Sequence, residues 1–452
     1  MINYITELID QFQETAKSFY DSLSFPHYPR VLVVGAALFL SSFGILAFLA
    51  PSVPAYGDAV VYAEQILSLD FSGTTMHIGY YILAAPFLYA FKFSPDHTLN
   101  LVNSFFGSLS VVAVYLIASA VFRKQFVGVA SGLLLLTNYL FVLNSIYAEV
   151  YISQSFLLLL AFYLLLCRRD IVAGLIYGLA ILVTPSSLFF APLYLLVSPY
   201  KRTLVYFFGL AFSVAAIILA PNLRDYLYGG RGLLTTEART QVVIYDAFLK
   251  ELYEVYFGQF VLVPFVFTGL FLILSEKRLR IFILAVSASW CLALIFGERG
   301  GISPVQLPNY AFLCMFGARG ISGFAGISSE KSKVLFVFLP IALSFILLLT
   351  LDISISTGAI KIAEVAISGK IWIAYLFVFA TITVASLLKQ KINTMTNIAP
   401  TLFLVLVLGP NAFWVYKLVD LKNTKLLEYR DTVLRVNQLA APDYIVVGDW
   451  DK

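Results

Sequence analysis

The stretch "IVAGLIYGLAILVTPSSLFFAPLYLLVS", residues 171–198, decides how this chain folds. It is almost entirely apolar and exceeds the roughly 20 residues that one helix needs to cross a bilayer. Basic pairs nevertheless flank both of its ends, at Arg168–Arg169 and Lys201–Arg202. Because basic loops are retained in the cytoplasm, the stretch must enter the membrane and return to the same side. Pro185 cannot continue a helix, so the sequence predicts two short helices that meet near the outer leaflet.

The same charge rule, applied to the whole chain, predicts an all-α, multi-span membrane protein with about 13 transmembrane helices. The basic clusters that it places in the cytoplasm are Arg30, Arg123–Lys124, Arg168–Arg169, Lys201–Arg202, Lys277–Arg280, Lys331–Lys333 and Lys389–Lys391. The candidate spans are 31–50, 98–122, 125–145, 150–167, 171–184, 185–198, 203–220, 259–274, 281–296, 304–318, 334–352, 371–388 and 398–416. An odd number of spans predicts a cytoplasmic N-terminus and an extracytoplasmic C-terminus.

Composition supports a membrane protein and excludes several other classes. The 452 residues are 60% hydrophobic and only 12% charged, about half the charge of a soluble domain. The sequence has no basic stripe of the kind that binds nucleic acid. Its three cysteines, Cys167, Cys291 and Cys314, lie in or beside apolar runs and have neither metal-site nor disulfide spacing.

This topology divides the chain into successive segments. They are an amphipathic helix on the cytoplasmic face (1–30), a transmembrane module (31–220) with a first outer loop (51–97), a second large outer loop (221–258), a further transmembrane module (259–416) and a short outer tail (417–452). Within the first outer loop, 78–91 is apolar but lacks a basic anchor, which predicts an interfacial helix rather than a span. All the long loops are on the outer face, and functional residues concentrate on loops held by a rigid scaffold.

The outer face carries the candidate acids. Asp58 and Glu64 follow the first span in "YGDAVVYAE", and Glu149 stands between two apolar stretches in "SIYAEVYISQSF". A carboxylate at the end of a span can act as a general base, or Asp58 can simply cap a helix. Glu149 likewise either marks the water interface or belongs to a functional site, since acids at membrane depth are costly. His77 and Lys92 lie on the same first loop as Asp58.

Arginines on the outer segments are candidate anion ligands. Arg224 and Arg231 lie on the second large loop, the latter in "YGGRG", and Arg299 lies in "GERGG". A guanidinium presents a planar fork of donors to a phosphate, and neighbouring glycines allow close approach of the backbone. Alternatively these arginines bind lipid headgroups or pair with nearby acids. No Ser-His-Asp order, phosphate-binding loop, zinc spacing or dinucleotide motif is present, and His77 with acids gives only a weak divalent-metal signal.

Four motifs together resemble the GT-C superfamily of polyprenyl-phosphate-dependent glycosyltransferases, closest to its protein O-mannosyltransferase-like branch. They are "GDAVVYAE", "HIGYYILAAPFLY", "LNLVNSFFGSLSVVAVYLIA" and "YAEVYISQSFLLLLAFYLLL". The resemblance covers about residues 50–200, including the broken helices around Pro185. Where the family has prolines after the histidine, this chain has Ile78 and Gly79.

The resemblance implies an inverting transfer of mannose or a similar hexose from a polyprenyl phosphate to a hydroxyl of a protein or glycan. It implies that Asp58 is the catalytic base, that Glu149 lines the same outer cavity, and that outer-loop arginines hold the lipid phosphate. The polyprenyl-phosphate sugar is then a co-substrate, and membrane lipid is a further partner. The alternatives are a lipid-linked glycan flippase or transporter, for which no internal repeat is seen, and a glycan polymerase or ligase.

Overall fold

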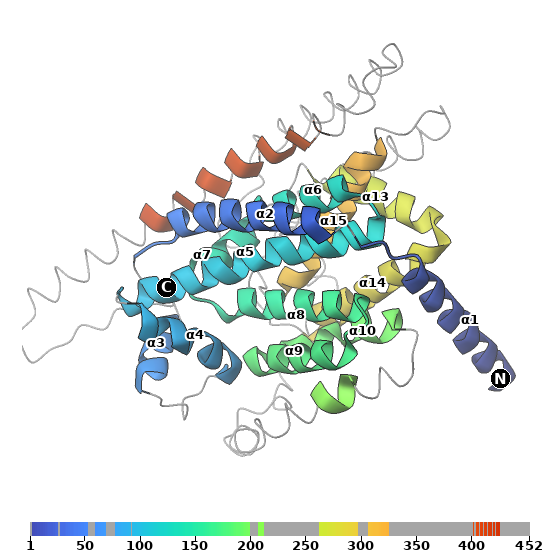
Figure 1. Ribbon diagram of the computed structural model, residues 1–452, viewed down its shortest axis with the longest axis horizontal. Helices are drawn as coiled ribbons and strands as arrows, with labels where there is room; N and C mark the ends of the chain where they lie inside the picture. Colours follow the sequence, from blue (N-terminus) through green and yellow to red (C-terminus); the bar gives the residue numbers. More distant parts are fainter. Residues whose placement is uncertain are drawn as a thin grey trace, which may run out of the picture.

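A computed structural model describes residues 2–25, 28–52, 59–68, 77–91, 93–198, 207–211, 262–296 and 306–324, and parts of a helical segment within 401–424. All of its labelled elements are helices (Figure 1). They are α1 (Ile2–Asp21), α2 (Tyr28–Leu49), α3 (Ala59–Ser68), α4 (Ile78–Ala90), α5 (Pro95–Phe122), α6 (Gln125–Leu136), α7 (Tyr139–Ile146), α8 (Val150–Leu166), α9 (Asp170–Val183), η1 (Pro185–Phe190), α10 (Ala191–Val197), α13 (Val263–Ser275), η3 (Lys277–Leu279), α14 (Arg280–Phe296) and α15 (Leu307–Phe324). The predicted all-α architecture is confirmed within these residues.

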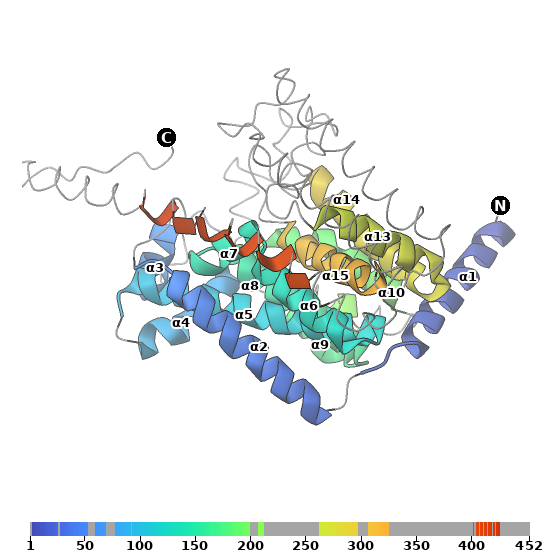
Figure 2. The ribbon, with the colours of Figure 1, turned by 90° about the horizontal axis from the view of Figure 1, so that it is seen from above.

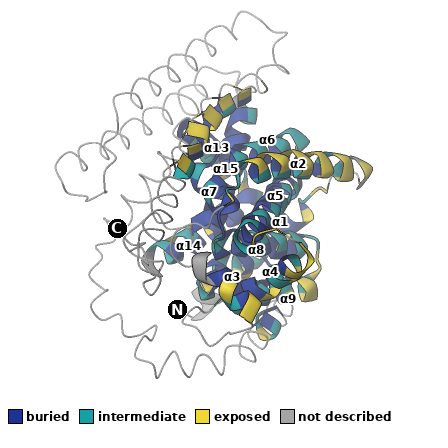
Figure 3. Ribbon diagram, turned by 90° about the vertical axis from the view of Figure 1, so that its left-hand side faces the viewer, coloured by how far each residue is buried: buried dark blue, intermediate teal, exposed yellow. Residues whose placement is uncertain are grey.

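Helix α5 forms the centre of the bundle, where it packs against α2, α6 and α8. A small residue also lets α7 approach α5 closely, since a Cβ on Gly107 would lie 2.5 Å from the Ser145 hydroxyl of α7. Two of the buried serines of α5 are satisfied within their own helix, because Ser108 Oγ donates to the Ser104 carbonyl at 2.7 Å and Ser110 Oγ donates to the Phe106 carbonyl at 2.9 Å. In contrast, α2 presents an exposed outer face (Figure 3), as expected of a helix that faces lipid.

Two of the described helices, α2 over Val31–Leu49 and α5, are long and apolar enough to cross a membrane. Helices α6 and α7 qualify as a third span if they are taken together, although a bend of 67° separates them. The sequence predicts an uninterrupted span over 125–145, but Asn138 caps α7 by accepting a hydrogen bond from the Phe141 N–H at 2.9 Å. The predicted total of about 13 spans stays a prediction, because spans such as 334–352 and 371–388 lie outside the described residues.

The chain breaks at Pro185, as the sequence predicts. Helix α9 ends at Val183, and a short 3₁₀ helix, η1, leads into α10. Tyr177 of α9 and Tyr194 of α10 have ring centroids only 4.6 Å apart, whereas a continuous helix would separate them by about 25 Å. The chain therefore turns back at the break, so that Tyr194 meets Tyr177 while α10 itself packs mainly against α14. Ser187 fixes the turn by donating to the Ala180 carbonyl at 2.8 Å.

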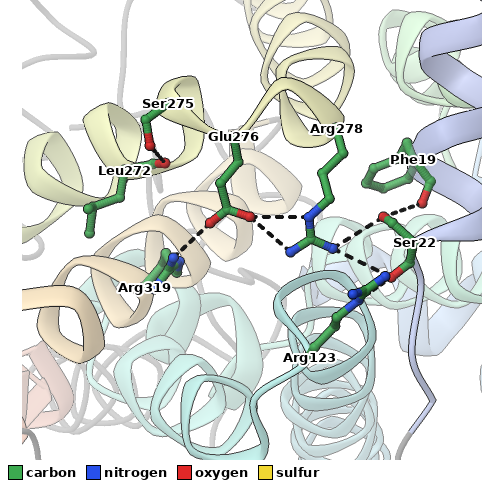
Figure 4. Close-up of polar contacts among 8 residues, drawn as sticks. All are labelled: Phe19, Ser22, Arg123, Leu272, Ser275, Glu276, Arg278 and Arg319. Carbon is green, nitrogen blue, oxygen red and sulfur yellow. Dashed lines mark hydrogen bonds and ion pairs between the residues drawn. The ribbon is translucent and has the colours of Figure 1, made fainter. Parts of the chain in front are cut away.

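Different helices lie at the two ends of the bundle, and a cluster of charged side chains lies at one of them. Helices α3 and α4 lie at one end and α1 at the other, in both of two perpendicular views (Figures 1 and 2). At the α1 end, Glu276 pairs with Arg278 at 2.9 Å and with Arg319 at 2.7 Å. Arg123 and Arg278 both donate to the Ser22 carbonyl at the end of α1 (Figure 4). These contacts tie α1, α5, α13 and α15 together.

We expect Glu276→Gln to lower the free energy of unfolding by about 1.5–3 kcal/mol, the usual contribution of hydrogen bonds to a charged group. Partial burial acts to raise the pKa of the Glu276 carboxyl, but the hydrogen bonds and charges of Arg319 and Arg278 outweigh it and hold the pKa below its ordinary value. A carboxyl of this kind stabilises the fold above its unfolded pKa, and the contribution is lost as the pH falls through the folded pKa.

Denaturant titration of the purified protein at several pH values measures this effect. The wild type and Glu276→Gln should differ at neutral pH and converge well below the ordinary glutamate pKa of about 4.3. Glu14→Gln is the matched control, because Glu14 lies exposed on α1. A difference that persists undiminished in acid would contradict an electrostatic role for Glu276.

Candidate active site

Glu149 lies at the end of the bundle opposite the Glu276 cluster. It directly precedes α8, in an extended backbone conformation, and its carboxylate does not cap that helix. Its side chain is half-buried between the buried residues Ala148 and Val150. A half-buried carboxylate at a helix start keeps part of its surface for a ligand while its surroundings fix its position.

Asn103 of α5 fixes the backbone on which Glu149 stands. Its side-chain amide donates to the carbonyls of Tyr147 at 2.5 Å, Glu149 at 2.7 Å and Asn144 at 3.2 Å. Its side-chain oxygen accepts a hydrogen bond from the Tyr80 hydroxyl at 3.0 Å. One fully buried amide therefore joins α4, α5 and the connection between α7 and α8. The motif "LNLVNS" contains this residue, although the sequence alone assigns it no role.

An aromatic wall stands beside Glu149. The Tyr62 ring of α3 contacts His77, Tyr80 and Tyr81, with centroid separations of 6.1, 5.4 and 6.0 Å. Burial, together with the nearby Glu149 carboxylate, raises the pKa of the Tyr80 hydroxyl. Tyr80 thus stays protonated at neutral pH and keeps its hydrogen bond to Asn103.

His77 joins this wall to the broken helix pair. Its Nδ1 lies 2.7 Å from the Val183 carbonyl at the end of α9. Since a carbonyl can only accept, Nδ1 carries the hydrogen and donates it. Gly79 makes this contact possible, because a Cβ there would lie 2.5 Å from the Val183 nitrogen. Gly79 therefore has a packing reason in this chain.

The Pro185 break also contributes polar groups at this end. Gln154 of α8 donates to the hydroxyls of Ser186 and Ser187 at 3.0 and 3.1 Å. Its side-chain oxygen is buried and has no hydrogen-bond partner among the residues that the structure describes. Polar side chains thus continue from Glu149 along the first turns of α8 to the start of η1.

Lys422 and Asn423, which were not predicted as site residues, also lie beside Tyr147, although they are far from it in the sequence. The Tyr147 hydroxyl donates to Asn423 at 2.5 Å, and the Asn423 amide donates to the Leu49 carbonyl at 3.3 Å. The Lys422 ammonium lies 4.5 Å from the centroid of the Tyr147 ring. Burial lowers the pKa of Lys422, while the Glu149 carboxylate acts in the opposite direction.

The structure describes only some of the predicted site residues. The structure brings Glu149, His77 and Glu64 to the same end of the bundle, but Glu64 is exposed on α3, unlike its buried neighbours Tyr62 and Ala63. Predicted site residues that lie outside the described residues are Asp58, Lys92, Arg224, Arg231 and Arg299. Across the described parts of the chain, no group of three or more His, Cys, Asp or Glu side chains is arranged to hold a metal ion.

No protein family and no curated protein matches this sequence. Solved structures do match: the crystal structure of ArnT from Cupriavidus metallidurans bound to undecaprenyl phosphate has a TM-score of 0.58 and 12% identity, over 90% of this chain and 81% of that chain. The apo state of the same protein has the same TM-score, with 13% identity and the same coverage. At such identity the likeness concerns the fold alone. This chain is accordingly an α-helical integral membrane protein with the GT-C fold of ArnT.

Proposed function

We propose that this protein is a membrane glycosyltransferase that moves a hexose from a polyprenyl phosphate to a hydroxyl acceptor on the extracytoplasmic face. The GT-C fold supports the proposal, as does the undecaprenyl phosphate bound by the structurally similar ArnT. The acceptor is a protein or a glycan. The finer prediction, membership of the O-mannosyltransferase-like branch, belongs to the same proposal.

The observation that carries the proposal is the polar cluster around Glu149. In this cluster the start of α8, the aromatic wall of α3 and α4, and the helical segment within 401–424 (the C-terminal segment) meet at one end of an apolar bundle. Asp58 directly precedes α3, whose Tyr62 contacts Tyr80. We assign Asp58 to the same site as Glu149 because it immediately precedes α3 in the sequence, and an acceptor-activating site needs a base near the groups that position the substrate.

The transfer is a single displacement. Asp58 accepts the proton of the acceptor hydroxyl, whose oxygen attacks the anomeric carbon of the sugar. The bond between that carbon and the phosphate oxygen breaks, and polyprenyl phosphate leaves with the bonding electron pair. A β-linked donor then gives an α-linked product. Glu149 accepts hydrogen bonds from sugar or acceptor hydroxyls, and His77 and Glu64 are further candidates for substrate contacts.

Mass spectrometry of the purified protein tests the donor class, with co-purified polyprenyl-phosphate hexose as the expected result. A transfer assay with that lipid and a hydroxyl acceptor then tests the reaction. Formation of a glycosylated acceptor together with released polyprenyl phosphate supports the proposal. Movement of the intact lipid across a vesicle membrane without product formation would instead favour the flippase or transporter.

Arg231→Ala should weaken donor binding about ten- to a hundredfold, because a lost charge-assisted contact to phosphate costs about 1.5–3 kcal/mol. Arg299→Ala is expected to act in the same direction. Equilibrium binding of undecaprenyl phosphate to the purified variants measures the effect. Arg168→Ala is the control, since Arg168 is an exposed cation at the opposite end of α8. Unchanged affinity in both loop variants would assign the phosphate to other cations, with Arg224 and Lys92 next.

A further inference from the structure

The C-terminal segment lies with one face against the bundle. Its buried residues recur every three or four positions, which is the spacing of one helix face. They are Leu404, Val407, Asn411, Val415 and Val419. Continuing the same spacing leads to Lys422 and Asn423, which are half-buried, whereas Lys417 is exposed. The packed face of this segment therefore turns polar where it reaches Tyr147.

Asn423 holds that end of the segment in place. It accepts from the Tyr147 hydroxyl and donates to the Leu49 carbonyl, so it bridges the end of α2 and the residues before α8. Asn103 in turn bonds the backbone of both Tyr147 and Glu149. The hydrogen bonds of Asn423 to Tyr147 and Leu49, and those of Asn103 to Tyr147 and Glu149, thus fix the position of Lys422 relative to Glu149.

Lys422 is a partly buried cation beside a carboxylate, but it forms no ion pair with any side chain in the described part of the chain. Its ammonium rests over the Tyr147 ring and interacts electrostatically with Glu149. A cation–aromatic contact offsets only part of the cost of burying an ammonium. A site that also contains a carboxylate repels a phosphate unless a cation compensates it, and an ammonium is a compact charge suited to that role.

We propose that Lys422 binds the phosphate of the lipid donor, so that the C-terminal segment completes the active site. This inference rests on the proposed function, because it assigns a residue to the donor of that reaction. It adds a cation from outside the two arginine-bearing loops and places the phosphate next to Tyr147. The reacting sugar would then lie next to Lys422 and Glu149.

Binding of undecaprenyl phosphate to the full-length protein in nanodiscs of zwitterionic lipid tests the proposal. Lys422→Met keeps most of the length of the side chain and removes its charge, and it should weaken binding about ten- to a hundredfold. Lys422→Arg should restore most of the affinity. Lys417→Met is the matched control, because Lys417 lies on the same segment, contacts the Tyr416 ring at 5.9 Å and is exposed. Thermal unfolding of each variant shows whether the fold is retained.

Two further ligands identify what Lys422 recognises. Undecaprenol lacks the phosphate, so its binding should be the same in the wild type and in Lys422→Met. Phosphatidylglycerol presents a phosphate on a bulk lipid, and equal competition by it would overturn the proposal in favour of a general anionic-lipid site. Wild-type binding that Lys422→Met leaves unchanged would overturn the role of Lys422 alone. Failure of the wild type to prefer undecaprenyl phosphate over undecaprenol would instead overturn the proposed function.

Discussion

Replacing Asp58 by asparagine is expected to lower the rate of sugar transfer by at least about a hundredfold, the lower bound for loss of a general base. Asparagine keeps the shape of the side chain but removes the basic oxygen that receives the proton. The lipid donor should still bind, because the base contacts the acceptor hydroxyl rather than the phosphate. Turnover of a polyprenyl-phosphate sugar with a hydroxyl acceptor, measured beside donor affinity, separates the two effects.

Comparison with other acids makes the test specific. Glu149→Gln should reduce turnover less than Asp58→Asn does, since Glu149 is proposed to position substrate. Glu64→Gln tests the other acid of the first outer loop; because Glu64 is exposed on α3, this change should reduce turnover less than either of the other two. Near-normal turnover in Asp58→Asn with an inactive Glu149→Gln would move the base to Glu149. If both variants were fully active, the glycosyltransferase proposal would be wrong and the transporter would gain support.

Local chemistry explains which parts of the fold could be predicted. The break at Pro185 follows from one residue that cannot donate a backbone hydrogen bond, so charge and proline together were sufficient. The bend between α6 and α7 lies in an apolar run whose hydropathy does not change. Its signal was Asn138, a favourable helix cap, which the apolar composition outweighed in the prediction of one span over 125–145. The side of the membrane that each end faces stays a prediction.

Some residues of the candidate site could be predicted from the sequence, and others could not. Glu149 and His77 could be singled out because a carboxylate or imidazole beside apolar runs is unusual. Their meeting at one end follows from the short connections of adjacent helices. Lys422 could not be predicted, because its contact with Tyr147 depends on how a distant segment packs. The buried spacing of 404–419 identifies a helix face, but spacing does not say which helix that face meets.

Asn103→Ala is expected to reduce turnover about a hundredfold and to lower the free energy of unfolding by at least about 2 kcal/mol. The change removes a donor shared by three carbonyls and leaves the Tyr80 hydroxyl without its acceptor. Each buried polar group left unsatisfied costs about 1–3 kcal/mol. The backbone before α8 then loses its anchor, and a displacement of catalytic groups by about 1 Å is enough for a hundredfold loss of rate.

Two companion variants separate positioning from general destabilisation. Ser110→Ala removes a buried hydroxyl from the same helix, one that bonds the Phe106 carbonyl of α5 at 2.9 Å, and should leave turnover nearly unchanged. Tyr80→Phe removes the partner of the Asn103 oxygen but keeps the three bonds of its amide, so it should cost less than tenfold in rate. If Tyr80→Phe were as damaging as Asn103→Ala, the Tyr80 hydroxyl rather than the anchored backbone would determine activity. Normal turnover in Asn103→Ala would show that Glu149 needs no such anchor, which would count against its role in holding substrate.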